Sequence, residues 1–132
     1  MITPEMAKRL DDERIIWMTT VRADGQPQSA PVWYVRHDDE IRVWSLDGYR
    51  VANIEQNPLV NLHLNDNGRG EQVLIIEGEA SIDQPIGPSS QDPLYVERYQ
   101  AWLDEYGWTW GWFDNNYPVP VRIRPTKVRA WD

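Results

Sequence analysis

The segment from Ser45 to Arg50 brings together the groups that bind an anion. It reads Ser-Leu-Asp-Gly-Tyr-Arg: a hydroxyl ends a predicted strand, a glycine turns the chain, and an arginine enters the first turn of a predicted helix. A cation there opposes the helix dipole, at a cost of about 0.3–1 kcal/mol. A bound phosphate would reverse that sign, because N–H groups, a hydroxyl and a guanidinium would converge on it. The alternative is that Arg50 extends into solvent or pairs with Asp47.

A second candidate segment runs from Ser29 to Tyr34 and reads Ser-Ala-Pro-Val-Trp-Tyr. Its proline has no N–H and so removes one hydrogen bond of the strand ladder, which leaves neighbouring backbone groups free. A flat ring with polar edges could take up those groups. A simple β-bulge at Pro31 is the alternative interpretation.

Other side-chain chemistries lack a supporting pattern. The chain has no cysteine, which excludes disulfides, thiol catalysis and thiolate metal sites. No G-x-S-x-G motif surrounds a serine. His37 and His63 stand on different predicted strands without a third ligand at metal spacing, so we expect no metal site. No residue stands out as catalytic.

Composition limits the partners and the setting. The net charge is −8, with 13 basic against 21 acidic residues, which argues against duplex nucleic acid or an anionic membrane as partner. No apolar run approaches the ~20 residues of a membrane span, and the N-terminus lacks the features of a signal peptide. We therefore expect one cytosolic domain over residues 1–132. The eight tryptophans suit cores, interfaces and flat ligands alike.

The elements that must position both segments follow from periodicity and from turn residues. The sequence predicts strands over 15–22, 28–37 with a break at Pro31, 40–45, 60–64, 72–82, 119–124 and 126–131. It predicts a helix over 4–13 with Thr3 as N-cap, a helix over 49–56, and a helix over 93–106 with Asp92 as N-cap and Gly107 just past its end. It predicts an aromatic loop over 108–116. Strand 28–37 is apolar on both faces, which favours a central position in the sheet. In helix 49–56 we expect Val51, Ala52 and Ile54 to be buried.

Consecutive strands joined by tight turns predict an antiparallel sheet. Several such strands in one small domain favour a barrel, because closure removes exposed edges. The expected fold class is therefore mostly β with small helices.

Several stretches, in this order, resemble the split β-barrel flavin-binding proteins related to pyridoxamine 5′-phosphate oxidase. They are Thr-Thr-Val-Arg-Ala-Asp-Gly-Gln-Pro-Gln at 19–28, Pro-Val-Trp-Tyr at 31–34, Asn-Ile at 53–54, Asn-Pro-Leu-Val-Asn-Leu at 57–62 and Glu-Gly-Glu-Ala at 77–80. The resemblance resumes over 121–131, where Arg122, Pro125, Thr126 and Trp131 fit the closing strand. It is similar in particular to the subgroup described as dependent on a deazaflavin, coenzyme F-420.

The resemblance implies a six- to seven-stranded antiparallel split β-barrel that forms a homodimer, with two cofactor sites at the subunit interface. In such proteins the end of the third strand and the following helix hold the phosphate, which maps onto Ser45, Leu46, Tyr49 and Arg50. The second strand lies along the isoalloxazine ring, which maps onto Ser29, Ala30, Pro31, Val32 and Trp33. The family usually has lysine where this chain has Arg50; arginine keeps the charge and can grip phosphate with two N–H groups.

The function that the resemblance implies is an oxidoreductase that binds FMN, or deazaflavin F-420, and passes hydride to or from a small substrate. The alternative is a split barrel that carries flavin or haem without turnover, with His37 and His63 as the available imidazoles. A third interpretation is an acidic barrel that has lost its site.

Two further features bear on that choice. The deazaflavin has a polyglutamate tail that would need a basic groove, for which Arg122, Arg124, Lys127 and Arg129 are candidates. The net charge of −8 favours FMN. Residues 83–118 do not match the family pattern, and the rings of their Trp-rich segment 102–113 either line the flavin pocket of a second subunit or the substrate mouth, or pack between the subunits of a dimer.

Overall fold

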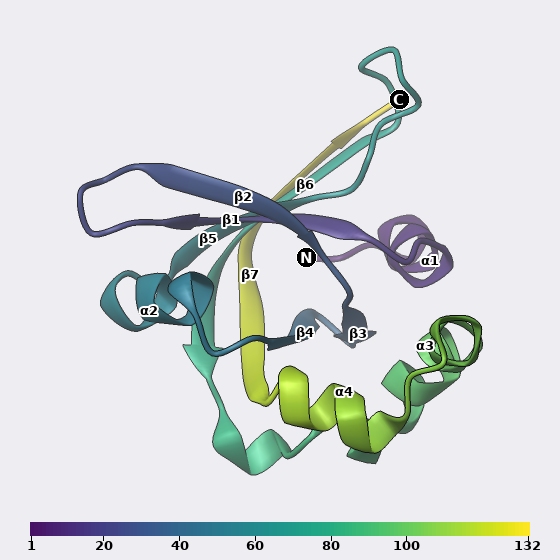
Figure 1. Ribbon diagram of the computed structural model, residues 1–132. Helices are drawn as coiled ribbons and strands as arrows, with labels where there is room; N and C mark the ends of the chain where they lie inside the picture. The colour runs from purple at the N-terminus through teal and green to yellow at the C-terminus, as the bar shows by residue number, and fades with distance from the viewer.

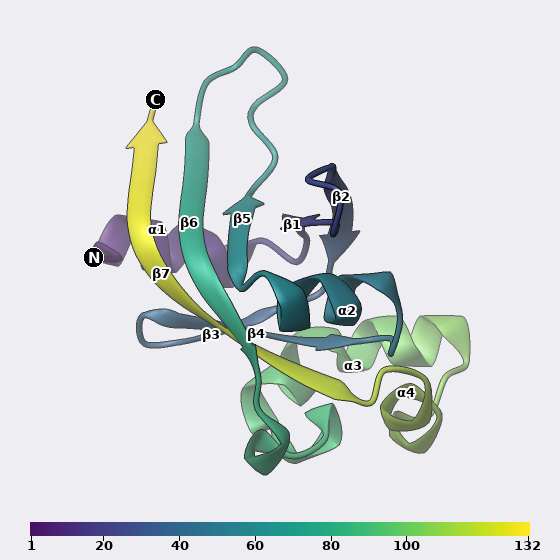
Figure 2. The same cartoon turned by 90° about the vertical axis from the view of Figure 1, so that its left-hand side faces the viewer.

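Seven antiparallel strands form one curled sheet, with four α-helices around it (Figures 1 and 2). The structure is a computed structural model that describes all residues from 1 to 132. The strands are β1 (Ile16–Val21), β2 (Pro27–Val32), β3 (Val35–His37), β4 (Glu40–Ser45), β5 (Leu59–His63), β6 (Val73–Ile82) and β7 (Val119–Trp131). The helices are α1 (Pro4–Asp12), α2 (Tyr49–Gln56), α3 (Pro93–Tyr106) and α4 (Trp110–Asn116), with two short 3-10 turns at Gln84–Ile86 and Ser89–Gln91. The predicted split-barrel fold class is confirmed.

The long strand β7 joins the two halves of the sheet. It pairs with β4 from Val119, opposite Ser45, to Ile123, opposite Ile41. It pairs with β6 over most of its length. The pairing with β6 shifts register at Gly78, opposite Pro125. Pro125 therefore marks a bulge in one continuous strand and does not separate two strands. A Cβ on Gly78 would lie 2.9 Å from the carbonyl oxygen of Arg124, so glycine permits the close approach at this bend.

Strand β2 lies at one edge of the sheet, whose order is β2-β1-β5-β6-β7-β4-β3. The prediction of a central strand over 28–37 is wrong. Pro31 sits within β2, paired with Trp17 of β1, and an edge strand tolerates it because its other side needs no ladder partner. The strand predicted over 28–37 is interrupted at Trp33 and Tyr34, which lie between β2 and β3. The apolar residues there are buried by helices, not by a second neighbouring strand.

Helix α2 lies across the sheet and buries Val51, Asn53 and Ile54. Ala52 is exposed, which corrects the expected buried side. The helical rotation of about 100° per residue places Ile54 between Val51 and Asn53 on the buried face. Its buried amide is satisfied, because Nδ2 donates to Thr20 Oγ1 over 3.0 Å and to Gln28 Oε1 over 2.9 Å.

Helices α3 and α4 pack together beside β3 and β4, at the end of the molecule opposite the free ends of β6 and β7 (Figures 1 and 2). They cover a second, aromatic core of Val35, Trp44, Tyr95, Tyr99, Leu103 and Phe113. The caps of α3 are as predicted, with Asp92 accepting from the Tyr95 N–H and Gly107 left-handed at φ 73°. Residues 110–116, predicted as loop, are helical because Thr109 caps them and Phe113 packs into this core. None of the helices has the length and apolar character needed to cross a membrane.

Candidate cofactor-binding site

A cleft of about 360 Å³ opens where β2 ends, where β4 turns into α2, and where α3 and α4 pack against both. Five of the nine predicted site residues line it: Pro31, Val32, Trp33, Leu46 and Arg50. The remaining wall consists of six aromatic side chains: Trp44, Tyr95, Tyr106, Trp108, Phe113 and Tyr117. The tertiary structure thus brings the two candidate segments, which are separate in sequence, to one cleft.

Arg50 is a half-buried cation without an acidic partner. Its Nη1 donates to Ser45 Oγ over 3.1 Å, and its guanidinium lies 5.6 Å from the centroid of the Tyr49 ring. No carboxylate lies within ion-pair distance of it, so the alternative pairing with Asp47 is wrong. Ser45 is 1% exposed and donates its own proton to the carbonyl of Leu46 over 2.8 Å. A hydroxyl and a guanidinium are therefore held together, with the positive charge uncompensated.

The N-terminus of α2 beside Arg50 has no side-chain cap. Gly48 stands at the N-cap, and the first turn contains no acidic residue. Helices α1 and α3, by contrast, are capped by the side chains of Thr3 and Asp92. The first N–H groups of a helix point outward and attract negative charge. Together with Arg50 they form the donor set expected of an anion site.

The other predicted residues lie around the cleft and not in its wall. Ser29 bonds through its hydroxyl to Thr19 Oγ1 over 2.6 Å on the exposed face of the sheet. Ala30 follows it in the edge strand, and Tyr49 stacks on Arg50 from outside. Because β2 has only β1 as a neighbour, the backbone along its other edge has no strand partner.

Part of the Trp-rich segment 102–113 lies in the aromatic wall of the cleft. Trp33 stacks with Tyr99 and Phe113 at centroid distances of 4.5 and 5.4 Å. Trp108 stacks with Tyr106 at 4.6 Å and contacts Trp112 at 4.5 Å. Of these rings, those of Trp33, Tyr106, Trp108 and Phe113 line the cleft of their own chain. Sequence reasoning noted the aromatic richness but could not assign Tyr95, Tyr106 or Tyr117 to the site.

Tyr95, one of the residues that line the cleft, has a buried hydroxyl that nothing in the protein satisfies. Its side chain is fully buried, and its hydroxyl makes no hydrogen bond. Burial raises the pKa of this phenol well above 10, so the group remains protonated and able to donate.

Neither histidine reaches the cleft. His37 Nε2 lies 2.7 Å from Asp92 Oδ2, beside the cap of α3. His63 stacks with Trp17 on another part of the sheet, at a centroid distance of 6.2 Å. An axial imidazole for haem is therefore not provided by the residues that line the cleft.

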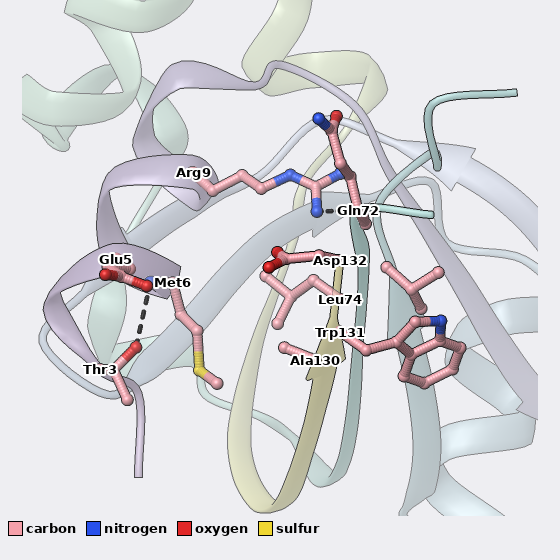
Figure 3. Close-up of a pocket in the computed structure, with 10 residues that line it drawn as sticks. Thr3, Glu5, Met6, Arg9, Gln72, Leu74, Ala130, Trp131 and Asp132 are labelled. Atoms are coloured by element: carbon pink, nitrogen blue, oxygen red, sulfur yellow. Dashed lines mark hydrogen bonds between the residues drawn. The ribbon is translucent and has the colours of Figure 1, made fainter. Parts of the chain in front are cut away.

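A larger hollow of about 580 Å³ lies between α1 and the end of β7 (Figure 3). Arg9 points into it but already donates to the carbonyl oxygens of Gln72 and, over 2.8 Å, of Asn65. None of the predicted site residues lines this hollow. We therefore place the candidate site in the smaller aromatic cleft, which is lined by Arg50, a cation without an acidic partner.

Comparison with known proteins agrees with this architecture. Similar solved structures include General Stress Protein 26 from Bacillus anthracis, at 25% identity over 97% of this chain and 92% of that one, with a TM-score of 0.70. An F-420 reductase is 22% identical over 96% and 98%, with a TM-score of 0.66. The haem storage protein from Vibrio cholerae is 19% identical over 98% and 94%, with a TM-score of 0.62.

No protein with a curated function matches the sequence. The family model described as pyridoxamine 5′-phosphate oxidase matches residues 2–132, which is nearly the whole chain. Sequence pattern, strand topology and this match agree, and the chain belongs to the pyridoxamine 5′-phosphate oxidase family of split β-barrel proteins.

Proposed function

We propose that the protein is an oxidoreductase that binds FMN in the aromatic cleft and acts on a small substrate. The observation that carries the proposal is Arg50, a half-buried cation with no acidic partner, next to an uncapped helix N-terminus and at the rim of a cleft with flat walls. The guanidinium, held in place by the Ser45 hydroxyl, and the N–H groups of α2 would hold the phosphate.

The rest of the cleft fits the ring system. Val32 and Trp33 present an apolar surface, and the free edge of β2 beside them offers backbone groups to the polar rim of a flat heterocycle. Trp108 and Phe113 would close the opposite side and exclude water. Bound flavin supplies the hydride chemistry, while the protein supplies orientation and a dry environment.

The charge distribution favours FMN over the deazaflavin. Three of the four cations considered for a polyglutamate groove already have acidic partners. Arg122 pairs with Glu40 and Asp83, Arg124 with Glu79 and Arg129 with Glu77. A long anionic tail would have to displace those carboxylates. The likeness to an F-420 reductase keeps the deazaflavin as the alternative cofactor.

The proposal includes a homodimer with the cofactor sites at its interface. Three large apolar side chains beside the cleft remain well exposed: Leu46 at 53%, Tyr49 at 50% and Trp112 at 42%. Large exposed apolar side chains, where they gather, mark interaction surfaces. A second copy of the chain would cover them and close the cleft. Sedimentation equilibrium tests this, with a dimer expected and a concentration-independent monomer contradicting it.

A flavin carrier without turnover is the second candidate function. The residues lining the cleft include no carboxylate and no histidine, so a general acid or base is limited to the phenols of Tyr95, Tyr106 and Tyr117. That observation favours simple binding. Haem lacks a comparable argument, because both histidines lie elsewhere.

The test begins with an absorption and fluorescence titration of the purified protein with FMN and, separately, with the deazaflavin. Saturable binding at one site per chain is expected for FMN. A protein that binds neither contradicts the proposal. The flavin-loaded protein is then mixed with reduced nicotinamide and a panel of acceptors. Turnover identifies an enzyme, whereas tight binding without any reduction identifies a carrier.

A further inference from the structure

The two residues between β2 and β3, Trp33 and Tyr34, leave the sheet beside the cleft. The ladder that pairs β2 with β1 ends at Val32, and the pairing of β3 with β4 begins at Val35. Tyr34 is nevertheless fully buried, so the polar groups of its backbone need partners outside the ladder. Side chains of helix α3 provide these partners.

The hydroxyl of Tyr99, in α3, is the central group of this contact. It accepts from the N–H of Tyr34 over 2.9 Å, and it lies 2.8 Å from the carbonyl oxygen of Arg14 and 2.9 Å from that of Tyr34. The neighbouring Arg98 donates through Nε to the same Tyr34 carbonyl over 2.9 Å, which leaves the proton of Tyr99 for Arg14. One buried hydroxyl thus ties α3 to the β2–β3 connection and to the segment before β1.

The ring of the same tyrosine holds the indole of Trp33. The two ring planes are parallel within 7° at a centroid distance of 4.5 Å, and Phe113 of α4 stacks on the same indole within 10° at 5.4 Å. Trp33 lines the cleft, whereas Tyr99 is fully buried and is not among the residues that line it. Any effect of Tyr99 on a ligand in the cleft is therefore transmitted through Trp33 and the backbone beside it.

We propose that Tyr99 is a positioning residue for the cofactor: its hydroxyl fixes the backbone between β2 and β3, and its ring fixes the indole of Trp33 in the wall that contacts the flavin ring. The inference rests on the proposed FMN site. A wall that is ordered before the ligand arrives lowers the entropy cost of binding. Such walls must hold their side chains within about 0.5 Å of the productive geometry, and packing together with buried hydrogen bonds achieves this.

Two tyrosine-to-phenylalanine variants separate positioning from a purely structural role. Tyr99→Phe keeps the stacked ring and removes the hydroxyl that fixes the backbone. Tyr34→Phe is the matched control, because Tyr34 is equally buried but its hydroxyl donates to the carbonyl oxygen of Leu10 in α1, over 2.6 Å. Both variants should stay folded, with melting temperatures lowered by about 3–6 °C, because each loses one buried hydrogen bond.

FMN is titrated into the wild type and the variants and followed by flavin fluorescence. We expect Tyr99→Phe to weaken FMN binding about three- to tenfold, the size of one neutral hydrogen bond, and Tyr34→Phe to change it by less than about twofold. Adding Tyr99→Phe to Trp33→Leu should cost less than about twofold beyond Trp33→Leu alone, because the residue through which Tyr99 acts is then missing.

The indole N–H signals in a nitrogen–proton correlation spectrum give a readout without any cofactor. The chain has eight tryptophans, and the signal that disappears in Trp33→Leu identifies Trp33. Tyr99→Phe should shift or broaden this signal, whereas Tyr34→Phe should leave it in place. The Trp33 signal decides by itself if Trp33→Leu does not bind FMN.

The outcomes separate the two proposals. Failure of the wild type to bind FMN overturns the proposed function and this inference with it. Normal FMN affinity in Tyr99→Phe, or an equal loss in Tyr34→Phe, overturns the inference alone. A loss that is just as large in the Trp33→Leu background also overturns it, because Tyr99 would then not act through Trp33. An unchanged Trp33 signal in Tyr99→Phe has the same consequence.

Discussion

The Nη1 of Arg50 donates a hydrogen bond to the Oγ of Ser45 over 3.1 Å, across the turn that leads from β4 into α2. The contact holds the guanidinium against a buried hydroxyl before any ligand arrives. Ordering a long side chain costs conformational entropy on binding. Because part of that entropy is already lost in the folded chain, the pair is prepared to bind an anion.

Replacing this arginine should weaken cofactor binding. We expect Arg50→Ala to lower the affinity for FMN about tenfold or more, equivalent to at least about 1.4 kcal/mol, since the only charged group that lines the cleft is lost. Arg50→Lys should retain most of the affinity, because it keeps the charge. Flavin fluorescence titration measures both. Riboflavin, which lacks the phosphate, is the matched ligand, and its affinity should respond little to either change. Unchanged FMN affinity in Arg50→Ala would remove the phosphate site from this turn.

Asn53 should stabilise the fold by joining helix α2 to the strands β1 and β2. Its amide joins α2 to Thr20 of β1 and to Gln28 of β2 through bonds of 3.0 and 2.9 Å. Asn53→Ala leaves the buried Thr20 hydroxyl without this donor, and we expect a loss of about 1–3 kcal/mol in the free energy of unfolding, measured by urea denaturation. The neighbouring, exposed Ala52→Ser is the control and should change stability by less than about 0.5 kcal/mol. Equal stabilities would show that the network contributes nothing.

Two glycine-to-alanine substitutions should change the stability of the fold in opposite directions. Gly78→Ala places a Cβ 2.9 Å from the backbone oxygen of Arg124, and neither strand can yield easily at the bulge. We expect a destabilisation of about 1–3 kcal/mol. Gly111→Ala, in helix α4, meets no atom closer than 3.9 Å and should stabilise by about 0.4–1 kcal/mol. Thermal unfolding of the two variants side by side checks the contrast, and a neutral Gly78→Ala would contradict the close approach.

Alkaline pH should destabilise the fold through three buried phenols. Burial raises the pKa values of Tyr34, Tyr95 and Tyr99 above their unfolded value of about 10. Their contribution to stability is therefore complete below pH ~10 and is lost as the pH rises further, since only the unfolded chain ionises there. Absorbance at the tyrosinate band should show that these three of the six tyrosines stay protonated until the chain unfolds. Ionisation of all six in the native state would refute this.

Local structure could be predicted from the sequence wherever capping and turn residues mark the ends of a helix or strand. The bounds of β4 and α2, and the caps of α1 and α3, match the predictions, because a cap or a turn involves residues only a few positions apart. The contact between Ser45 and Arg50 is local as well, because both residues lie within one strand-turn-helix unit; that this unit binds an anion stays a prediction.

Three features depended on distant partners and were missed. The edge position of β2 depends on which strands find each other, not on the pattern within residues 28–37. Helix α4 forms where Phe113 meets the aromatic core, a stabilisation absent from residues 108–116 considered alone. The burial of the Asn53 amide was not among the predictions, because its partners, Thr20 and Gln28, are 33 and 25 positions away.

The sequence by itself determined the family, the mostly β fold and the two segments that form one side of the cleft. It did so because local periodicity, turn residues and a charged first helical turn are properties of neighbouring residues. Only the tertiary structure decided that Tyr95, Trp108 and Phe113 form the other side, and that the Tyr95 hydroxyl is left without a partner. Whether a buried polar group is satisfied depends on every atom around it, and those atoms come from segments that only folding brings together.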